Sequence, residues 1–165
     1  IRTEVSDVIF GADEETMESV VLSLLASRGL TLGVAESVTG GLVAGRLTSV
    51  AGSSTVFHGG IVSYASAVKH DLPGVPQGPV VSHDAADAMA RGVRRVLGCD
   101  VGLALTGVAG PTEQDGQAVG TLFVSVAMPD DTVHTHNLRL PGQPDQMRQL
   151  SVISALDVLR RAITN

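Results

Sequence analysis

The chain has 165 residues, of which 44% are hydrophobic and 17% charged, so we expect one globular domain with a real core, and general disorder is excluded. The formal net charge is −6, only 2% of residues are aromatic and no run of basic residues occurs, which makes nucleic acid and anionic membranes poor partners. A single cysteine, Cys99, excludes an internal disulfide and a zinc-finger site.

The first half of the chain alternates helices and strands. Residues 1–13 are mixed in character and predict a linker or N-terminal arm ahead of a domain that we place at residues 14–165. Apolar residues at helical spacing predict a helix over residues 14–29, and a short buried strand follows at residues 30–36. A second helix, closed by Gly52, is then expected from residue 40, with a second strand at residues 59–66.

The second half ends in a hairpin and a long helix. A short helix at residues 67–75 breaks at Pro73, and Ser82 is the expected N-cap of a helix that ends at Gly98. The remaining predicted elements are a strand at residues 100–107, strands at residues 119–129 and 132–140, and a helix at residues 144–163.

This order of elements predicts an α/β fold, a three-layer α/β/α sandwich around a mixed sheet of about five strands. Ligands bind outside the carboxyl ends of strands in such sheets. Three predicted strand exits carry polar or glycine-rich sequence, at residues 36–41, 63–64 and 106–111. If these strands are parallel neighbours, the three loops converge on one composite site.

The first of these exits offers a hydroxyl and backbone donors. Ser37 precedes a predicted helix start, where the N–H groups of Thr39, Gly40 and Gly41 suit an oxyanion or a phosphate. A serine nucleophile needs a base. None of the five histidines lies beside a glycine-rich strand exit, so no Ser-His-Asp triad is visible. The alternative is that Ser37 and Thr39 are simple helix caps.

The better candidate base is Lys69, the only lysine of the chain, which follows the only tyrosine, Tyr64, by five positions. Burial lowers the pKa of a lysine toward neutrality, and the flanking Ala67 and Val68 permit burial. Tyr64 could then donate a hydrogen bond or relay a proton. The alternatives are a solvated charge for the lysine and a packing role for the tyrosine.

Several other residues admit two interpretations. Gly107 and Gly110 suit either ligand contact or plain turns, and Arg148 is a surface charge unless its helix start faces the site. His134 and His136 lie two apart on one predicted strand, but no third ligand is evident, so an exposed edge strand is favoured over a metal site. No Walker-type phosphate loop occurs.

Taken together, these motifs resemble the C-terminal domain of the CinA family, the nicotinamide-mononucleotide deamidases. The family motif Ala-Glu-Ser-x-Thr-Gly-Gly corresponds to residues 35–41, and its Gly-Ser-Ser stretch leading to a tyrosine corresponds to residues 51–64. The family lysine falls on Lys69. The Thr-Gly-x-Ala-Gly-Pro motif and the Val-Gly-Thr strand start correspond to residues 106–111 and 119–121. Separated motifs in the right order are far more specific than any one alone.

The resemblance implies a three-layer α/β/α fold and hydrolysis of the carboxamide of nicotinamide mononucleotide to the acid and ammonia, without metal or cofactor. It implies Ser37 as nucleophile, Lys69 as base and Tyr64 as an assisting group. We assign substrate contacts to the surrounding polar and glycine residues, namely Glu36, Thr39, Gly40, Gly41, Thr106, Gly107, Gly110 and Arg148. We also expect a cytoplasmic homo-oligomer, fused in the full-length protein to an N-terminal domain that resembles molybdopterin-binding domains.

The chain departs from the family pattern in three places. Val38 replaces a cysteine, residues 112–118 replace a glycine-rich, lysine-containing continuation, and Gly142-Gln143-Pro144 replaces Gly-Asp-Arg, so that only Arg148 remains as an arginine there. Two other functions therefore stay open. One is a pocket that binds a nucleotide without turning it over, and the other is a dimerisation module for an N-terminal domain.

Overall fold

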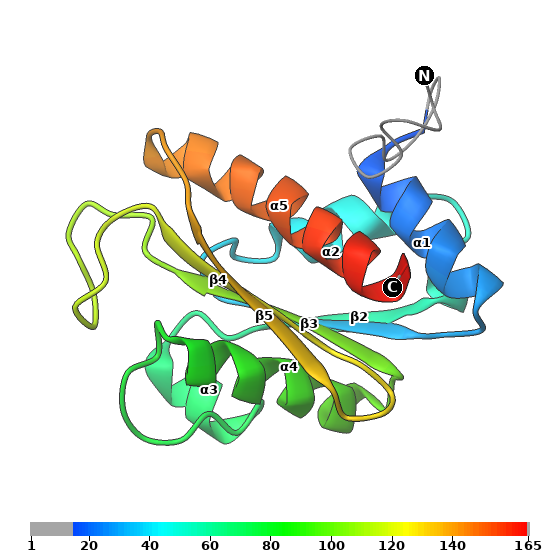
Figure 1. Cartoon of the computed structure of the whole chain (residues 1–165), viewed down its shortest axis with the longest axis horizontal. Helices are drawn as coiled ribbons and strands as arrows, with labels where there is room; N and C mark the ends of the chain where they lie inside the picture. The colour runs from blue at the N-terminus through cyan, green and yellow to red at the C-terminus, as the bar shows by residue number, and fades with distance from the viewer. Residues whose placement is uncertain (1–14, 165) are drawn as a thin grey trace.

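The computed structural model describes residues 15–164, and the arm predicted at residues 1–13 lies outside that range. A five-stranded sheet lies between two layers of helices (Figure 1). The strands are β1 (Leu32–Glu36), β2 (Phe57–Val62), β3 (Val101–Gly107), β4 (Thr121–Ala127) and β5 (Val133–Arg139). One face carries α1 (Met17–Ser27), α2 (Leu42–Thr48) and α5 (Pro144–Thr164), and the other carries α3 (Ser66–Asp71) and α4 (His83–Leu97).

The order of strands in the sheet is β2-β1-β3-β4-β5. The first three are parallel to one another, whereas β4 and β5 are antiparallel to their neighbours, so the predicted mixed α/β sheet is confirmed. Glu36 at the end of β1 lies opposite Val62 of β2 on one side and Leu105 of β3 on the other. Since the three parallel strands end at the same level, the loops that follow them meet at one edge of the sheet.

Local sequence explains where the helices begin and end. Thr16 and Ser19 form a reciprocal capping box at the start of α1. The predicted cap at Ser82 is confirmed, because its hydroxyl accepts a hydrogen bond from Ala85 N–H, and Gly98 ends α4 in the left-handed conformation. These signals fix the helices that flank the sheet.

The helix predicted at residues 40–52 is shorter than expected, since α2 ends at Thr48 and a 3₁₀ turn (η1, Ser53–Thr55) follows. The hydroxyl of Thr48 donates to Ala44 O, and that of Ser49 donates to Gly45 O. Such bonds from side chain to backbone compete with helix continuation. The second strand also differs from the prediction, because β2 begins at Phe57 and ends before Ser63.

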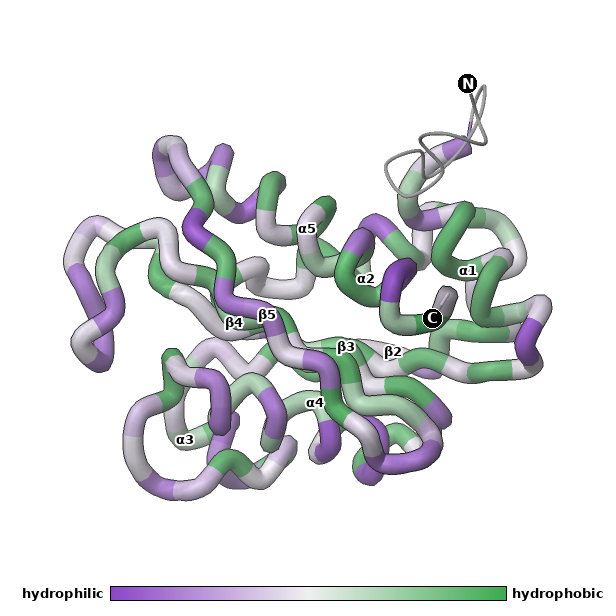
Figure 2. Tube along the Cα trace, in the orientation of Figure 1, coloured by the Kyte–Doolittle hydropathy of each residue, from purple (hydrophilic) through white to green (hydrophobic). Residues whose placement is uncertain are grey.

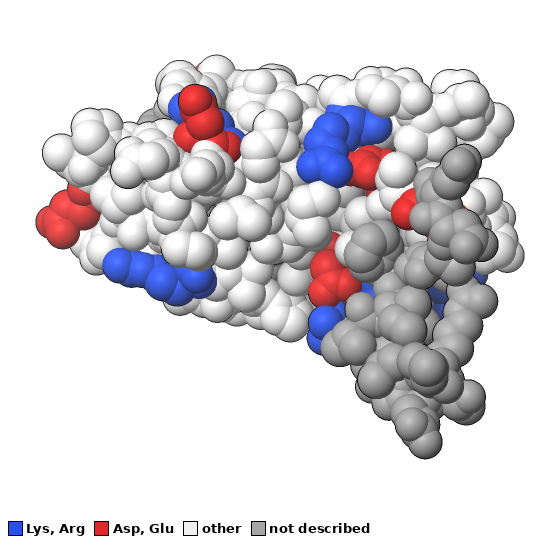
Figure 3. All heavy atoms as spheres, turned by 90° about the horizontal axis from the view of Figure 1, so that it is seen from above, with Lys and Arg blue, Asp and Glu red and all other residues white. Residues whose placement is uncertain are grey.

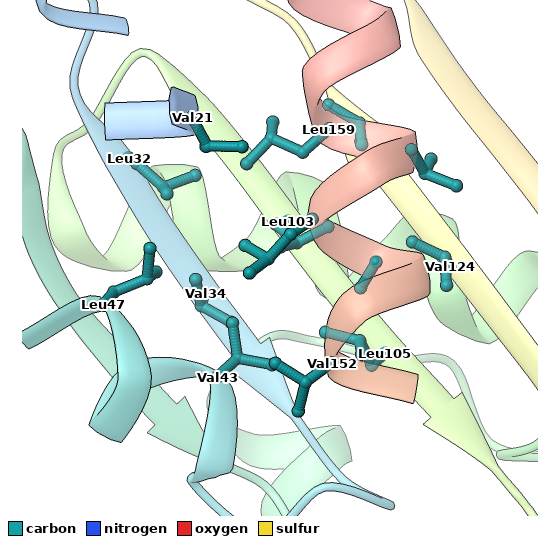
Figure 4. Packing of buried hydrophobic residues seen from close by; sticks show 14 of the residues in the cluster. Val21, Leu32, Val34, Val43, Leu47, Leu103, Leu105, Val124, Val152 and Leu159 are labelled. Carbon is teal, nitrogen blue, oxygen red and sulfur yellow. The ribbon is translucent and has the colours of Figure 1, made fainter. Parts of the chain in front are cut away.

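The main core lies between the sheet and the layer of α1, α2 and α5. Figure 4 shows the aliphatic side chains of this layer packed together, among them Val21, Leu32, Val43, Leu103 and Val152. The opposite face of the sheet is built from smaller residues, including Ala35, Ala104 and Ala127. These small residues let α4 approach the sheet closely: a Cβ on Gly102 would stand 2.1 Å from the carbonyl oxygen of Ala90.

On the face over α1, α2 and α5, the basic side chains that are visible are scattered and do not gather into a patch (Figure 3). The strand β5 lies at one edge of the sheet, and His134 and His136 on it are exposed, as predicted; Figure 2 shows hydrophilic stretches along this strand. No helix within residues 15–164 is long and apolar enough to cross a membrane.

Candidate active site

A pocket of about 370 Å³ lies at the edge of the sheet where the three parallel strands end, which is a volume typical of small-molecule sites. In Figure 1 the loop after β3, helix α3 and the start of α5 lie at this end of the molecule. The lining comes from four separate segments of the chain: Ser37 and Val38, Tyr64 and Lys69, residues 107–110 and 112–114, and Arg148. The predicted convergence of the three strand exits is therefore present.

The turn that carries Ser37 is held by the buried carboxylate of Glu36. One oxygen of Glu36 accepts hydrogen bonds from the Thr39 hydroxyl at 2.6 Å and from the N–H groups of Gly41 and Val43 at 3.1 and 3.0 Å. The other oxygen accepts from Ala44 N–H at 2.8 Å. A carboxylate at this place satisfies the free donors at the start of α2 and is favoured by the helix dipole.

Five residues assigned above to substrate binding are consequently not among the pocket lining. They are Glu36, Thr39, Gly40, Gly41 and Thr106. The bonds of Glu36 occupy the Thr39 hydroxyl and the Gly41 N–H, and Gly40 N–H donates to Ser37 O at 3.1 Å. The Thr106 hydroxyl donates to Val80 O at 2.7 Å. These bonds hold the turn after β1 and the end of β3 in place, and substrate contact by these five residues stays a prediction.

Other backbone donors remain at the pocket. Within the described part of the chain, the N–H groups of Val38, Ala109 and Gly110 make no hydrogen bond, and all three residues line the pocket. The N–H of Val38 directly follows Ser37. Backbone donors beside a nucleophile are the groups that stabilise an oxyanion in acyl transfer. The candidate oxyanion donors are thus Val38 and the loop after β3.

Lys69 is buried, not solvated, although it lies on a helix of only six residues. Its side chain is 2% exposed, and its amine makes no hydrogen bond to any residue in the range 15–164. Burial lowers the pKa of this amine, and the negative charge of Asp115 partly opposes that effect. Lowering this pKa increases the fraction of the amine that is neutral at a given pH, and a neutral amine can accept a proton.

Ser37 lines the same pocket as Lys69, and its hydroxyl too makes no hydrogen bond among the residues that the structure describes. A bond between nucleophile and base often forms only when substrate binds. Tyr64 lines the pocket with a ring that is 65% exposed. An aromatic ring in that position offers a flat apolar face to an incoming ligand.

Two further charged side chains line the pocket, Arg148 from α5 and Glu113 from the loop after β3. Arg148 has one ion pair, at 3.5 Å from Asp145, and the Asp145 side chain is almost fully exposed. Such an exposed pair is weak, so the guanidinium is available to an anionic ligand. The pocket lining thus combines the amine of Lys69 with one guanidinium and one carboxylate.

Asp115 was not among the predicted site residues, although its charge opposes the lowering of the Lys69 pKa and its carboxylate accepts hydrogen bonds from Val80 and Val81. Asp115 and Gly116 form a two-residue turn with φ of +53° and +72°, flanked by paired Gln114 and Gln117. The signal was present in the sequence, because Asp-Gly is a strong indicator of a two-residue hairpin turn.

The lining residues form a small-molecule pocket outside the carboxyl ends of the parallel strands of an α/β domain. Residues 14–163 match the model of the CinA C-terminal domain, so the chain belongs to the CinA C-terminal domain family.

Similar proteins carry names of the same kind. A CinA-like protein of Frankia casuarinae is 50% identical, over 98% of this chain and 38% of that protein. A putative competence-damage inducible protein of Desulforamulus reducens is 41% identical, over 97% of this chain and 40% of its own length. Among solved structures, the competence/damage inducible protein CihA of Agrobacterium tumefaciens is 31% identical, with a TM-score of 0.85, covering 95% of this chain and 99% of that one. The chain spans about two-fifths of the length of these two sequence relatives.

Proposed function

We propose that this domain hydrolyses the carboxamide of nicotinamide mononucleotide to nicotinic acid mononucleotide and ammonia, with Ser37 as nucleophile and Lys69 as base. The observation that carries the proposal is that the only lysine of the chain is buried, with a lowered pKa, in a pocket that Ser37 also lines. A lowered pKa increases the share of neutral amine, and the neutral amine is the form that can take the proton of a serine hydroxyl.

The reaction is a two-step acyl transfer. Ser37 Oγ attacks the amide carbon while the neutral amine of Lys69 takes the hydroxyl proton, and the oxyanion forms beside the N–H groups of Val38 and of the loop after β3. Lys69 then passes the proton to the leaving nitrogen, ammonia departs, and the C–N bond is replaced by an ester to Ser37. Water attacks this ester with Lys69 again as base, which releases the acid and restores the hydroxyl.

The remaining lining residues suit the rest of the ligand. Arg148 is the candidate partner of the phosphate, and the exposed Tyr64 ring lies at the pocket to cover the pyridine ring or assist a proton transfer. Glu113 supplies a negative charge that complements a cationic pyridinium. Gly107 and Gly110 let the ligand approach the backbone of the loop after β3 closely.

The test measures ammonia released from nicotinamide mononucleotide in the presence of EDTA. We expect activity in the unaltered chain and a loss of about 10²–10⁴-fold or more in both Ser37→Ala and Lys69→Ala. Ser23→Ala, at an exposed serine of α1, is the matched control and should retain activity. Full activity in either pocket variant contradicts the assigned roles.

A second candidate function is binding of a pyridine nucleotide without turnover. The observation in its favour is that residues 112–118 and Pro144 depart from the family pattern, and residues 112–114 of this set line the pocket. Nucleotide-dependent thermal stabilisation of the unaltered chain, without ammonia release, identifies this function.

The N-terminal domain and the homo-oligomer expected above also remain proposals. The larger size of the sequence relatives supports a further domain in the full-length protein.

A further inference from the structure

The loop between β3 and β4 ends in a rigid two-residue turn beside the pocket. Gln114 N–H donates to Gln117 O at 3.1 Å and Gln117 N–H donates to Gln114 O at 2.8 Å, which closes the turn at Asp115 and Gly116. Asp115 is one of two non-glycine residues with positive φ in the described range, a conformation that aspartate tolerates better than most residues. The turn therefore fixes where its carboxylate points.

That carboxylate connects the turn to a second segment. One oxygen of Asp115, Oδ2, accepts hydrogen bonds from both Val80 N–H, at 2.8 Å, and Val81 N–H, at 2.9 Å. Val80 O in turn accepts the hydroxyl of Thr106 at the end of β3. The turn, residues 80–81 and the end of β3 are thus bonded to one another behind the loop that lines the pocket.

Asp115 is also the charged group that acts on the buried amine of Lys69, in the direction that favours its protonated form. The other titratable or charged groups at the pocket or on the lysine's own helix are Tyr64, His70, Asp71, Glu113 and Arg148, with Glu36 beneath the Ser37 turn. Asp115 directly follows Gln114, which lines the same pocket as Lys69, so the carboxylate and the amine belong to one site.

We propose that Asp115 is a positioning residue for the acyl-transfer site, whose carboxylate anchors the pocket wall to residues 80–81 and stabilises the ammonium that forms when Lys69 takes a proton. This inference rests on the proposed function for its catalytic meaning. Asp115 itself does not line the pocket and touches no substrate.

The structure allows the two roles of Asp115 to be separated. Because both backbone donors bind the same oxygen, the amide oxygen of Asp115→Asn can accept both hydrogen bonds while the charge is removed. Asparagine also tolerates positive φ. Asp115→Ala removes charge and anchor together. Asp71→Asn, at an exposed residue of α3 two positions from Lys69, is the control for loss of a nearby negative charge.

The first measurement is a pH titration of Lys69 by NMR in the whole chain labelled with ¹³C-lysine, which yields one lysine signal because Lys69 is the only lysine. In Asp115→Asn we expect the pKa of Lys69 to fall below its value in the unaltered chain, since an attractive charge is lost. In Asp71→Asn it should stay unchanged. An unchanged or raised pKa in Asp115→Asn overturns the inference, and so does an equal fall in Asp71→Asn.

The second measurement is the pH dependence of ammonia release. The rising limb of the profile should move to lower pH in Asp115→Asn and not in Asp71→Asn, an effect that a merely structural residue would not produce. Asp115→Ala should melt at a lower temperature than Asp115→Asn, and equal melting temperatures contradict the anchoring role. If Lys69→Ala retains full activity, the proposed function fails while the NMR titration still decides whether Asp115 controls the charge of Lys69.

Discussion

The side chain of Lys69 is 2% exposed, and no group within residues 15–164 offers its amine a hydrogen bond. A buried ammonium without such partners costs free energy, because the charged form loses its hydration. The negative charge of Asp115 offsets only part of this cost, since the pKa of Lys69 remains lowered. The residue proposed as the base is therefore one that the folded protein keeps at the expense of stability.

Lys69→Met should consequently stabilise the protein while removing activity. The pKa of Lys69 is lower in the folded chain than its ordinary value of 10.5. At a pH below both pKa values, the lysine is protonated in the folded and in the unfolded chain. The full cost of burying the charge then lowers the free energy of unfolding. At neutral pH we expect a gain of the order of 1 kcal/mol in the free energy of unfolding. The gain should shrink as the pH rises toward 10.5, because the folded lysine becomes neutral. Urea unfolding at a series of pH values measures it.

Arg148→Met provides the comparison for this experiment. It also removes a cation from the pocket lining, but from a side chain that is already well solvated, so it should bring no pH-dependent gain. Two results would contradict a net cost of burying this amine. One is a Lys69→Met protein that is less stable than the unaltered chain at pH 7, and the other is a gain in the free energy of unfolding that grows with pH.

At the same scale, residue type in the sequence was enough to predict two residues that line the pocket. It was not enough for residues whose role depends on backbone geometry. Ser37 and Lys69 stand out by motif and by rarity, and both line the pocket. Glu36 was assigned to substrate, yet its carboxylate reaches four donors of the following turn and helix. That arrangement depends on the path of residues 37–44, which no residue pattern specifies.

At the scale of elements, the position of α3 depends on how closely α4 approaches its neighbours. A Cβ on Gly92 of α4 would stand 1.9 Å from the carbonyl oxygen of Pro73, which lies two residues after the end of α3. Val75 N–H donates to Lys69 O at 3.0 Å, so the same segment is bonded to the backbone of the lysine. The close contact at Gly92 therefore fixes where the segment after α3 lies relative to α4, and this segment is bonded to the backbone of Lys69.

Gly92→Ala should therefore destabilise the domain and disturb the pocket. The overlap is with backbone, which cannot rotate away, so we expect a loss of about 1–3 kcal/mol and a lower melting temperature, with reduced ammonia release from the displaced lysine. Gly45→Ala in α2 is the matched control: no atom lies within 4 Å of its added methyl group, and alanine is the better helix former, so it should gain roughly 0.5–1 kcal/mol. Equal thermal stability of the two variants contradicts the close contact.

Most elements could be predicted from the sequence because their signals are local. Apolar spacing and the caps at Ser82 and Gly98 located α4, and the order of helices and strands followed from their alternation. The largest boundary differences lie at α2, at β2 and at α3, which was predicted to reach residue 75 and ends at Asp71. At α2, the hydroxyl groups of Thr48 and Ser49 donate to backbone carbonyls and compete with continuation of the helix. At β2, the length of the strand depends on pairing with β1, which is a long-range contact.

At the scale of the whole molecule, the pocket joins elements that are far apart in sequence and held together only by the fold. Its lining comes from the turn after β1, from α3, from the loop after β3 and from the first part of α5. A ligand that contacts all four segments binds only the folded chain. Its binding free energy therefore adds to the stability of the fold.

Ser37→Ala should be stabilised by nicotinamide mononucleotide, because the variant keeps the rest of the pocket but does not consume the ligand. At a ligand concentration 100 times the dissociation constant the gain is about 2.7 kcal/mol, which corresponds to a rise of about 5–10 °C in melting temperature for a domain of this size. Differential scanning fluorimetry over a ligand series measures it, and Arg148→Ala in the same background should shift the curve to higher ligand concentrations. A melting temperature that does not move at any concentration would remove the nucleotide pocket altogether and leave assembly as the function that the fold supports, since both catalysis and binding without turnover require this linkage.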